Sequence, residues 1–297
     1  MRLILSRKGF DSQYGGVPSP IFPDDAMFSL PIPSAYEMQC LGEICYKDID
    51  VGTLAAQLTG NRINQETRVH LDPDLHRPAL DRAPGWRPAF GQIASAQSHL
   101  SKQNVGEGDV FLFFGWFRKV ERSGAMWRYV HGSPDIHVIF GWLQVGEVLS
   151  VGRQTENILG ANPWLLAHPH VTRAPQFESH NNTIYIGSET LALGGKKTRF
   201  PGGGAFERFS PMLRLTAEGR TRSVWSLPSW FSPDGKPSGL TYHTKQSRWS
   251  QRGDSVELQS VAKGQEFVLD CEHYPESEEW LAALLAQSSS SDTKGSP

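Results

Sequence analysis

The sequence has few cysteines, and those it has are not arranged as a known cysteine motif. Cys40, Cys45 and Cys271 are the only three, and no two of them form a Cys-x-x-Cys pair. An odd number of unpaired cysteines argues against a disulfide framework and fits a reducing cytoplasm. We therefore expect a cytoplasmic protein.

Long apolar runs and net charge are also lacking. No stretch approaches the ~18 apolar residues that a membrane-spanning helix needs, and residues 1–5 are too short for the apolar core of a signal peptide. The formal net charge is −2, so no global basic field attracts nucleic acid. These absences predict no membrane association, and they make a long duplex the least expected partner.

What is present is the composition of an ordinary globular protein. The 297 residues are 38% hydrophobic and 20% charged. Glycine (29 residues), proline (20) and tryptophan (9) are frequent, which indicates many short strands and turns. A Walker phosphate loop is absent, and the glycine-rich stretch at 202–204 is not clearly followed by a helix. A dinucleotide-binding fold is therefore not supported.

Two buried strands are predicted in the middle of the chain, over residues 108–118 and 137–145. Both runs are apolar, β-branched or aromatic, and each contains Phe-Gly-Trp, ending at Trp116 and at Trp142. A glycine inside a strand usually marks a bulge or a close backbone approach. The pair predicts either a curved sheet with an aromatic face at its mouth or a core hairpin that binds nothing.

A polar loop follows the strand predicted at residues 2–5. Lys8, Asp11 and Ser12 provide a cation, a carboxylate and a hydroxyl close together. A loop after a strand end is a common place for functional groups, so these residues are candidates for holding a phosphate or a metal-bound nucleotide. The alternative is a solvated turn.

The most informative short motif contains His70, Asp72 and Asp74. Because the three residues alternate, their side chains share one face of an extended segment. An imidazole and two carboxylates on one face suit a divalent metal or a general acid–base pair. The alternative is a polar strand edge on which Asp74 caps a helix.

A pair of histidines, His168 and His170, has the spacing of metal ligands on an extended segment. A third ligand would have to come from elsewhere, with His70, Asp72 and His137 as candidates. The alternative is two partly exposed loop histidines.

The remaining elements are predicted from hydrophobic periodicity and from the turn-forming residues that bound each segment. A short strand end followed by a helix is predicted over residues 48–58. Helices are predicted over 90–103 and 277–285, strands over 213–216, 222–225 and 264–270, and a disordered polar tail over 288–297. Asn182 precedes another predicted strand, where its amide would contact a base edge or cap a turn.

Taken in order, several of these segments resemble the family called nucleotide modification associated domain 3. The resemblance covers about residues 2–285 and is carried by residues 6–12, 16–20, 29–33, 70–75, 111–118, 168–170 and 264–268. It implies a protein of bacteria or phages that occurs alongside enzymes modifying nucleic-acid bases. It implies an association with nucleotides but supplies no list of catalytic residues.

The two central strands are also locally similar to the EVE and ASCH branch of the PUA-like barrels. That likeness implies a barrel that holds a modified base in an aromatic pocket, with Trp116 and Trp142 positioned to stack on it and Arg118 beside them. The expected fold is therefore α+β: a mixed, mostly antiparallel sheet with a PUA-like, partly closed β-barrel and a few flanking helices. A single domain is expected over residues 1–287.

The favoured hypothesis is a metal-assisted enzyme acting on a nucleotide or a nucleic-acid base. The alternatives are a non-catalytic module that binds a modified base or nucleotide and an interaction scaffold without a small ligand. The sequence does not distinguish tRNA from DNA, nor does it give the oligomeric state. The expected site residues are catalytic Lys8, Asp11, Asp72 and Asp74, nucleotide-binding Ser12, Trp116, Arg118, Trp142 and Asn182, and His70, Asp72, His168 and His170 around a divalent metal ion.

Overall fold

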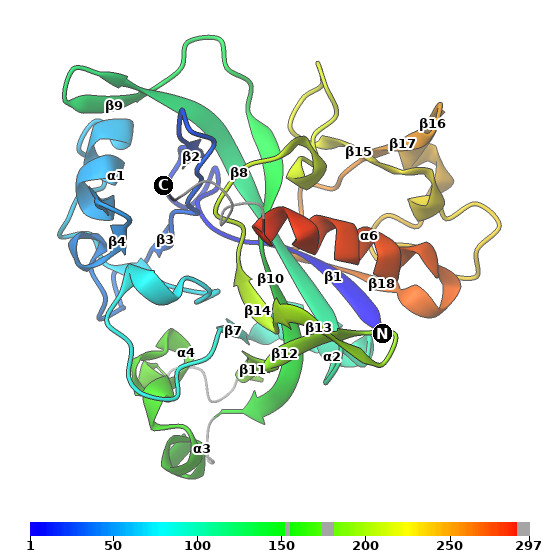
Figure 1. Ribbon diagram of the computed structural model, residues 1–297, viewed down its shortest axis with the longest axis horizontal. Coiled ribbons are helices and arrows are strands. Elements are labelled where there is room, and N and C mark those ends of the chain that lie inside the picture. Colours follow the sequence, from blue (N-terminus) through cyan, green and yellow to red (C-terminus); the bar gives the residue numbers. More distant parts are fainter. Residues whose placement is uncertain (152–154, 174–180, 290–297) are drawn as a thin grey trace, which may run out of the picture.

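A computed structural model describes residues 1–151, 155–173 and 181–289 of the chain. Two long strands, β8 and β10, cross its centre, and the other elements are arranged around them (Figure 1). The small helix α1 (Val51–Thr59) lies beside β9 (Met126–Tyr129). Helix α6 (Glu276–Ala286) passes in front of β1 (Arg2–Arg7) in this view. No helix in these ranges has the length and apolar character needed to cross a bilayer.

The main sheet has nine strands, of which six follow the order β18-β1-β8-β10-β11-β7. Most neighbours are antiparallel, and β1 and β2 each run parallel to β8. The strands are β1 (Arg2–Arg7), β2 (Ser19–Ile21), β7 (Ala89–Gln92), β8 (Val110–Ser123), β9 (Met126–Tyr129), β10 (Ile136–Ser150), β11 (Thr183–Gly187), β14 (Gly203–Ala205) and β18 (Glu266–Asp270).

The predicted central strands are confirmed as β8 and β10, which pair in antiparallel register with His137 opposite Trp116. Their aromatic side chains are almost all buried in the largest core cluster. The register shifts between Ile139 and Gly141. A side chain at Gly141 would lie 2.4 Å from Leu75 Cδ1, so the glycine permits the close approach of that loop.

The mixed, mostly antiparallel α+β class is confirmed, whereas the PUA-like barrel is not. Among the residues that the structure describes, no closed barrel forms, because the end strands β18 and β7 do not pair through their backbones. A side-chain contact connects them instead: Gln92 Nε2 donates to Glu266 Oε1 over 2.7 Å. The sheet is thus open in its hydrogen bonding.

The helix predicted over residues 90–103 is wrong in its first part. Residues 89–92 form β7, which pairs with β11, and helix α2 (Ala94–Lys102) begins only after it. The helical spacing of Ile93, Gln97 and Leu100 could not reveal this boundary, because Phe90 also fits a helical stripe. Tertiary pairing decides such short segments.

The other elements are short and surround the sheet. The predictions for residues 48–58, 264–270 and 277–285 are confirmed, whereas residues 213–216 form the end of a 3₁₀ turn and two isolated bridges rather than a strand. Most of the predicted disordered tail, residues 290–297, lies outside the described residues.

The remaining helices and strands are α1 (Val51–Thr59), α3 (Thr155–Ala161), α4 (Pro169–Thr172), α6 (Glu276–Ala286), β3 (Ile32–Pro33), β4 (Cys45–Tyr46), β5 (Ile49–Asp50), β6 (Val69–His70), β12 (Thr190–Leu193), β13 (Lys196–Pro201), β15 (Val224–Pro228), β16 (Trp249–Arg252) and β17 (Ser255–Gln259). Short 3₁₀ turns lie at Leu41–Glu43, Arg77–Ala79, Pro163–Ala167, Pro211–Leu213, Ser229–Phe231, Gln246–Arg248, Cys271–His273 and Gln287–Ser289.

Candidate functional site

Two histidines and one aspartate, distant in sequence, converge on one point. His70 ends β6, Asp72 follows it, and His170 lies in α4. Asp72 Oδ2 is 3.6 Å from His70 Nε2 and 3.5 Å from His170 Nε2. One ligand atom from each residue lies within 4.8 Å of the others, which is an arrangement that could hold a metal ion.

The His70 ring is fixed from its far side. Its Nδ1 is 2.8 Å from Oε1 of Glu37, a carboxylate with only 2% of its side chain exposed. The same carboxylate oxygen accepts from Arg173 Nη1 over 2.9 Å. Since a carboxylate only accepts, Nδ1 carries a proton, and Nε2 is the ring nitrogen that faces Asp72.

The His170 ring is fixed in the same way by an amide. Its Nδ1 lies 2.7 Å from Asn182 Oδ1, and Asn182 Nδ2 donates to the His170 carbonyl over 2.8 Å. On the other side the ring packs onto Gly91, where a Cβ atom would be 2.2 Å from His170 Cδ2. A residue with any side chain at position 91 would displace the imidazole.

His168 faces the second oxygen of Asp72 rather than the point of convergence. Its Nδ1 accepts from the backbone N–H of His170 over 3.2 Å, which places the ring proton on Nε2. That Nε2 lies 3.7 Å from Asp72 Oδ1, which also accepts from the Gly91 backbone N–H over 2.9 Å. Within the described ranges the buried Nε2 has no hydrogen-bond partner. Burial lowers the pKa of His168 to about 3 and keeps the ring neutral.

The cluster attracts positive charge. Burial lowers the pKa of His70, but the Asp72 and Glu37 carboxylates outweigh it and bring the value to about 9. Burial likewise opposes ionisation of Asp72, yet its hydrogen bonds to His170 and His70 hold the pKa of that carboxyl well below its ordinary value. Buried anionic groups of this kind bind a proton or a metal cation.

Asp74 does not join this cluster, so the expected shared face of His70, Asp72 and Asp74 is only partly formed. Its two carboxylate oxygens accept from the Arg82 guanidinium over 2.6 and 2.7 Å. Trp86 Nε1 also donates to it over 3.1 Å. The backbone between the two aspartates does not continue as a strand, and Asp74 therefore faces away from the histidines. Its contacts are those of a structural ion pair.

A cleft of about 640 Å³ opens beside the histidines and the aspartate, and the predicted residues Lys8 and Asp11 line it. Lys8 Nζ is 2.8 Å from Glu266 Oε1 and lies over the Phe90 ring. Asp11 Oδ1 accepts from the backbone N–H groups of Gln13 and Tyr14, each over 2.7 Å, and so shapes the loop. We call this space the histidine cleft.

A second cleft, of about 330 Å³, contains Ser12 and Trp116 from the expected nucleotide-binding set. The Arg222 guanidinium lies 4.1 Å from the centroid of the Trp116 ring and donates to Ser12 Oγ over 3.2 Å. His137 also lines this cleft and is therefore not the third ligand beside His168 and His170. We call this space the arginine cleft.

The other expected nucleotide contacts lie outside both clefts. Trp142 is 3% exposed and donates to the Pro201 carbonyl over 3.0 Å, so its ring belongs to the core and is not available to stack on a base. Arg118, on β8, forms an ion pair with Asp135, with 2.7 Å between Arg118 Nε and Asp135 Oδ1. Asn182, as described above, positions His170. The expected pair of indole rings at one mouth is thus not formed.

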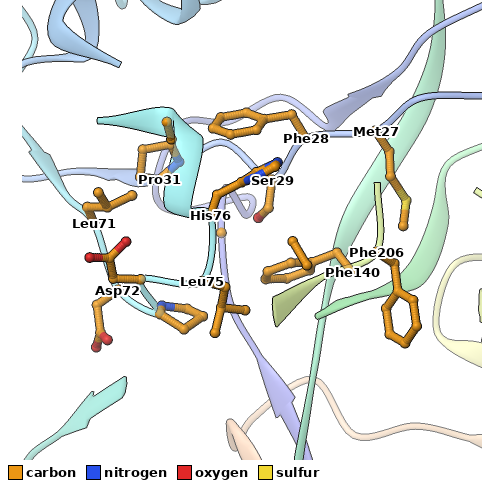
Figure 2. Close-up of a pocket in the computed structure, with 15 residues that line it drawn as sticks. Met27, Phe28, Ser29, Pro31, Leu71, Asp72, Leu75, His76, Phe140 and Phe206 are labelled. Atoms are coloured by element: carbon orange, nitrogen blue, oxygen red, sulfur yellow. The ribbon is translucent and has the colours of Figure 1, made fainter. Parts of the chain in front are cut away.

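A small apolar cavity lies on the other side of the Asp72 loop. Its volume is about 50 Å³, too small for a nucleobase. Figure 2 shows Leu71 and Asp72 at one end of it and Phe28, Phe140 and Phe206 towards the other. These apolar side chains support the loop that carries Asp72.

Several residues that shape the two clefts could not be singled out from the sequence. Glu37 orients His70 from a loop that follows β3, and nothing in the residues near it suggests a role. Arg7 lies in the polar loop predicted after residues 2–5, Arg222 begins a predicted short strand, and neither position suggests a role. The pairing of β7 with β11 brings Gly91 and Asn182 together around the His170 ring, and this surrounding could not be predicted from the residues near His170.

Comparison with known proteins gives one match. The model of the family described as nucleotide modification associated domain 3 matches residues 2–270. No curated protein and no solved structure matches the chain.

Proposed function

The chain belongs to the nucleotide modification associated domain 3 family, and from that premise we propose that it is a metal-assisted enzyme acting on a nucleotide or a nucleic-acid base. The family name associates the chain with nucleotide modification and with nucleotides or nucleic acid as partners. The observation that carries the metal-assisted reaction is the convergence of His70, Asp72 and His170.

The distances fit a metal ion. Two ligand atoms that each lie about 2.1 Å from a tetrahedral metal are roughly 3.4 Å apart. The distances from Asp72 Oδ2 to the two histidine nitrogens are 3.6 and 3.5 Å. Metal-bound histidines usually donate their second N–H to a fixed acceptor, as His70 and His170 do to Glu37 and Asn182.

Two histidines and one carboxylate suit zinc or ferrous iron. A bound divalent ion would activate a water or polarise a substrate oxygen, because three protein ligands leave coordination positions open. The protein's own contribution is to hold both imidazoles and the carboxylate in place before anything binds. His70 is held by Glu37, His170 is held by Asn182, and Asp72 is held by the backbone N–H of Gly91.

The histidine cleft has room for the substrate. Its volume of about 640 Å³ lies within the usual range of small-molecule sites. Lys8 and Asp11 line the wall formed by the loop after β1, where we propose that they contact the substrate. Asp72 acts as a ligand in this scheme, and Asp74 is assigned no part in the reaction.

Metal analysis followed by an activity screen tests the proposal. Purified protein is stripped with a chelator and titrated separately with Zn²⁺, Mn²⁺ and, without oxygen, Fe²⁺. Each form is then incubated with nucleotides and short oligonucleotides, and the products are digested and examined by mass spectrometry. The expected result is a metal-dependent change in the mass of one nucleoside.

Absence of stoichiometric binding for every ion would contradict the proposed site. Tight binding of nucleotides with no mass change in any metal form would instead favour a non-catalytic binding module. A variant His170→Ala serves as the negative control, since it removes one proposed ligand and leaves the walls formed by residues 7–14 and 262–265.

A further inference from the structure

The arginine cleft adjoins the histidine cleft along one segment of chain. Both clefts are lined by Arg7, Lys8, Asp11, Gln13 and Ala262. One face of this segment therefore looks towards the histidine cluster and the other towards Trp116 and Arg222. A single ligand that passes over the loop after β1 would contact both spaces.

Two guanidinium groups line the arginine cleft without a carboxylate partner. Arg7 donates to the carbonyls of Val261 and Ala262, each over 2.9 Å, and Arg222 contacts Ser12 and the Trp116 ring. In the described part of the chain, no ion pair forms at either group. Both arginines line the same cleft. Burial lowers the pKa of Arg7, and the charge of Arg222 lowers it further.

Asp11 offsets only part of this charge. It raises the pKa of Arg7 and, together with Asp135, that of Arg222, but burial outweighs these carboxylates in both cases. A guanidinium stays charged under all ordinary conditions. The cleft therefore holds two positive charges whose direct hydrogen bonds go to neutral oxygens.

Neutral donors complete the wall. His137 Nδ1 accepts from Trp225 Nε1 over 3.0 Å, so its proton lies on Nε2. Burial and the two arginines hold the pKa of His137 well below its ordinary value, and the ring stays neutral. Ser260, only 4% exposed, lines the cleft, and its Oγ has no hydrogen-bond partner among the residues described. Buried polar groups are normally satisfied, so an unpartnered hydroxyl beside two cations indicates an anionic ligand.

We propose that the arginine cleft binds a phosphate group of the substrate, with Arg7 and Arg222 as its charged contacts and His137 and Ser260 as neutral donors. The inference rests on the proposed function in one respect: the nucleoside part of the same molecule extends into the histidine cleft. A phosphate has enough oxygens to accept from both guanidinium groups at once. The contact with the Trp116 ring holds the Arg222 guanidinium in place before the phosphate binds.

Calorimetric binding of matched ligands tests this assignment. The probes are the common nucleoside 5′-monophosphates, the corresponding nucleosides, and a short single-stranded oligonucleotide. The full chain is compared with Arg222→Gln and Ser260→Ala, and with Arg220→Gln as a matched control. Arg220 lies two residues away and pairs with Glu257 over 3.2 Å at the surface.

The native chain is expected to prefer a nucleotide over its nucleoside by about tenfold or more, since a charge-assisted hydrogen bond contributes that much. Arg222→Gln should remove most of the preference while leaving nucleoside binding unchanged, Ser260→Ala should reduce it by a smaller factor, and Arg220→Gln should not change it. Preference for the oligonucleotide over the mononucleotide would support the same cleft and identify the phosphate as a backbone diester.

Equal affinity for nucleotide and nucleoside in the native chain would overturn the inference, as would equal losses in Arg222→Gln and Arg220→Gln. His170→Ala separates this result from the proposed function. A His170→Ala protein that has lost metal but keeps the nucleotide preference upholds the phosphate cleft. A native chain that binds no metal yet loses the preference in Arg222→Gln upholds the cleft and rejects the metal-assisted reaction.

Discussion

The two clefts on either side of the loop after β1 have opposite chemistry. In the histidine cleft, two imidazole nitrogens and the Asp72 carboxylate converge, and each imidazole is held by a buried acceptor. In the arginine cleft, two guanidinium groups contact carbonyl and hydroxyl oxygens. The first arrangement suits a cation and the second an anion, so the difference indicates how one substrate would be oriented across both.

The largest expected effect concerns the converging ligands. Asp72→Ala and His170→Ala should each reduce bound metal from one equivalent per chain to a trace, because each removes one of three ligand atoms. Elemental analysis of purified protein measures this. His131→Ala, a change at an exposed histidine, should retain the full equivalent. If Asp72→Ala keeps its metal, the ion is bound elsewhere.

Asp74 sharpens the comparison because it stands two residues from Asp72 and makes only structural contacts. Asp74→Asn should lower the free energy of unfolding by about 3 kcal/mol, because it leaves the largely buried Arg82 cation without its carboxylate. Urea unfolding measures the loss. Metal content in the absence of urea should stay at the native level. A stable Asp74→Asn protein without metal would mean that Asp74, too, is a ligand.

The acceptors behind the histidines should have a smaller effect. Asn182→Ala frees the His170 ring and should weaken metal binding by about 10–100-fold, the usual result of losing such a contact. Glu37→Gln keeps an oxygen for His70 Nδ1 and should weaken binding less. Competition with a chromogenic chelator measures both. Native affinity in Asn182→Ala would show that ring orientation does not limit binding.

The smallest expected effect is a dependence of stability on pH that lies outside both clefts. His243 is fully buried, and burial lowers its pKa from 6.5 to about 4. As pH falls from 6.5 towards 4, the unfolded chain binds a proton at this position that the folded chain does not. Stability should therefore decrease by about 1.4 kcal/mol per pH unit from this residue alone.

Urea unfolding across that pH range in the native chain and in His243→Gln isolates this contribution. The variant should show a slope that is shallower by one proton. Identical slopes would assign the acid sensitivity to other buried histidines, such as His168, whose pKa is lowered in the same direction to about 3.

The sequence predicted much of the fold where local pattern decides it. The continuous β-branched and aromatic runs of β1, β8 and β10 favour buried strands, and the apolar stripe of α6 favours a helix. It failed at β7, where Gly91 and Phe90 take their conformation from pairing with β11 rather than from their own preferences. The PUA-like barrel is not confirmed for a related reason, since the closure of a sheet depends on which distant strands pair.

The candidate site was predictable only in its parts. Residue types and spacing identified His70, Asp72, His168 and His170. They could not show that His168 contacts the far side of Asp72 or that Asp74 binds Arg82, because those facts depend on the path of the backbone between β6 and β7. Trp142 illustrates the same limit: its ring packs against Gly204, which a pattern of aromatic residues cannot reveal.

The most direct test is a crystal of chelator-treated protein soaked with Zn²⁺ and measured at the zinc absorption edge. The account predicts one anomalous peak about 2.0–2.2 Å from His70 Nε2, His170 Nε2 and a carboxylate oxygen of Asp72. A peak bound by other residues, or none at full occupancy of the soak, would contradict it.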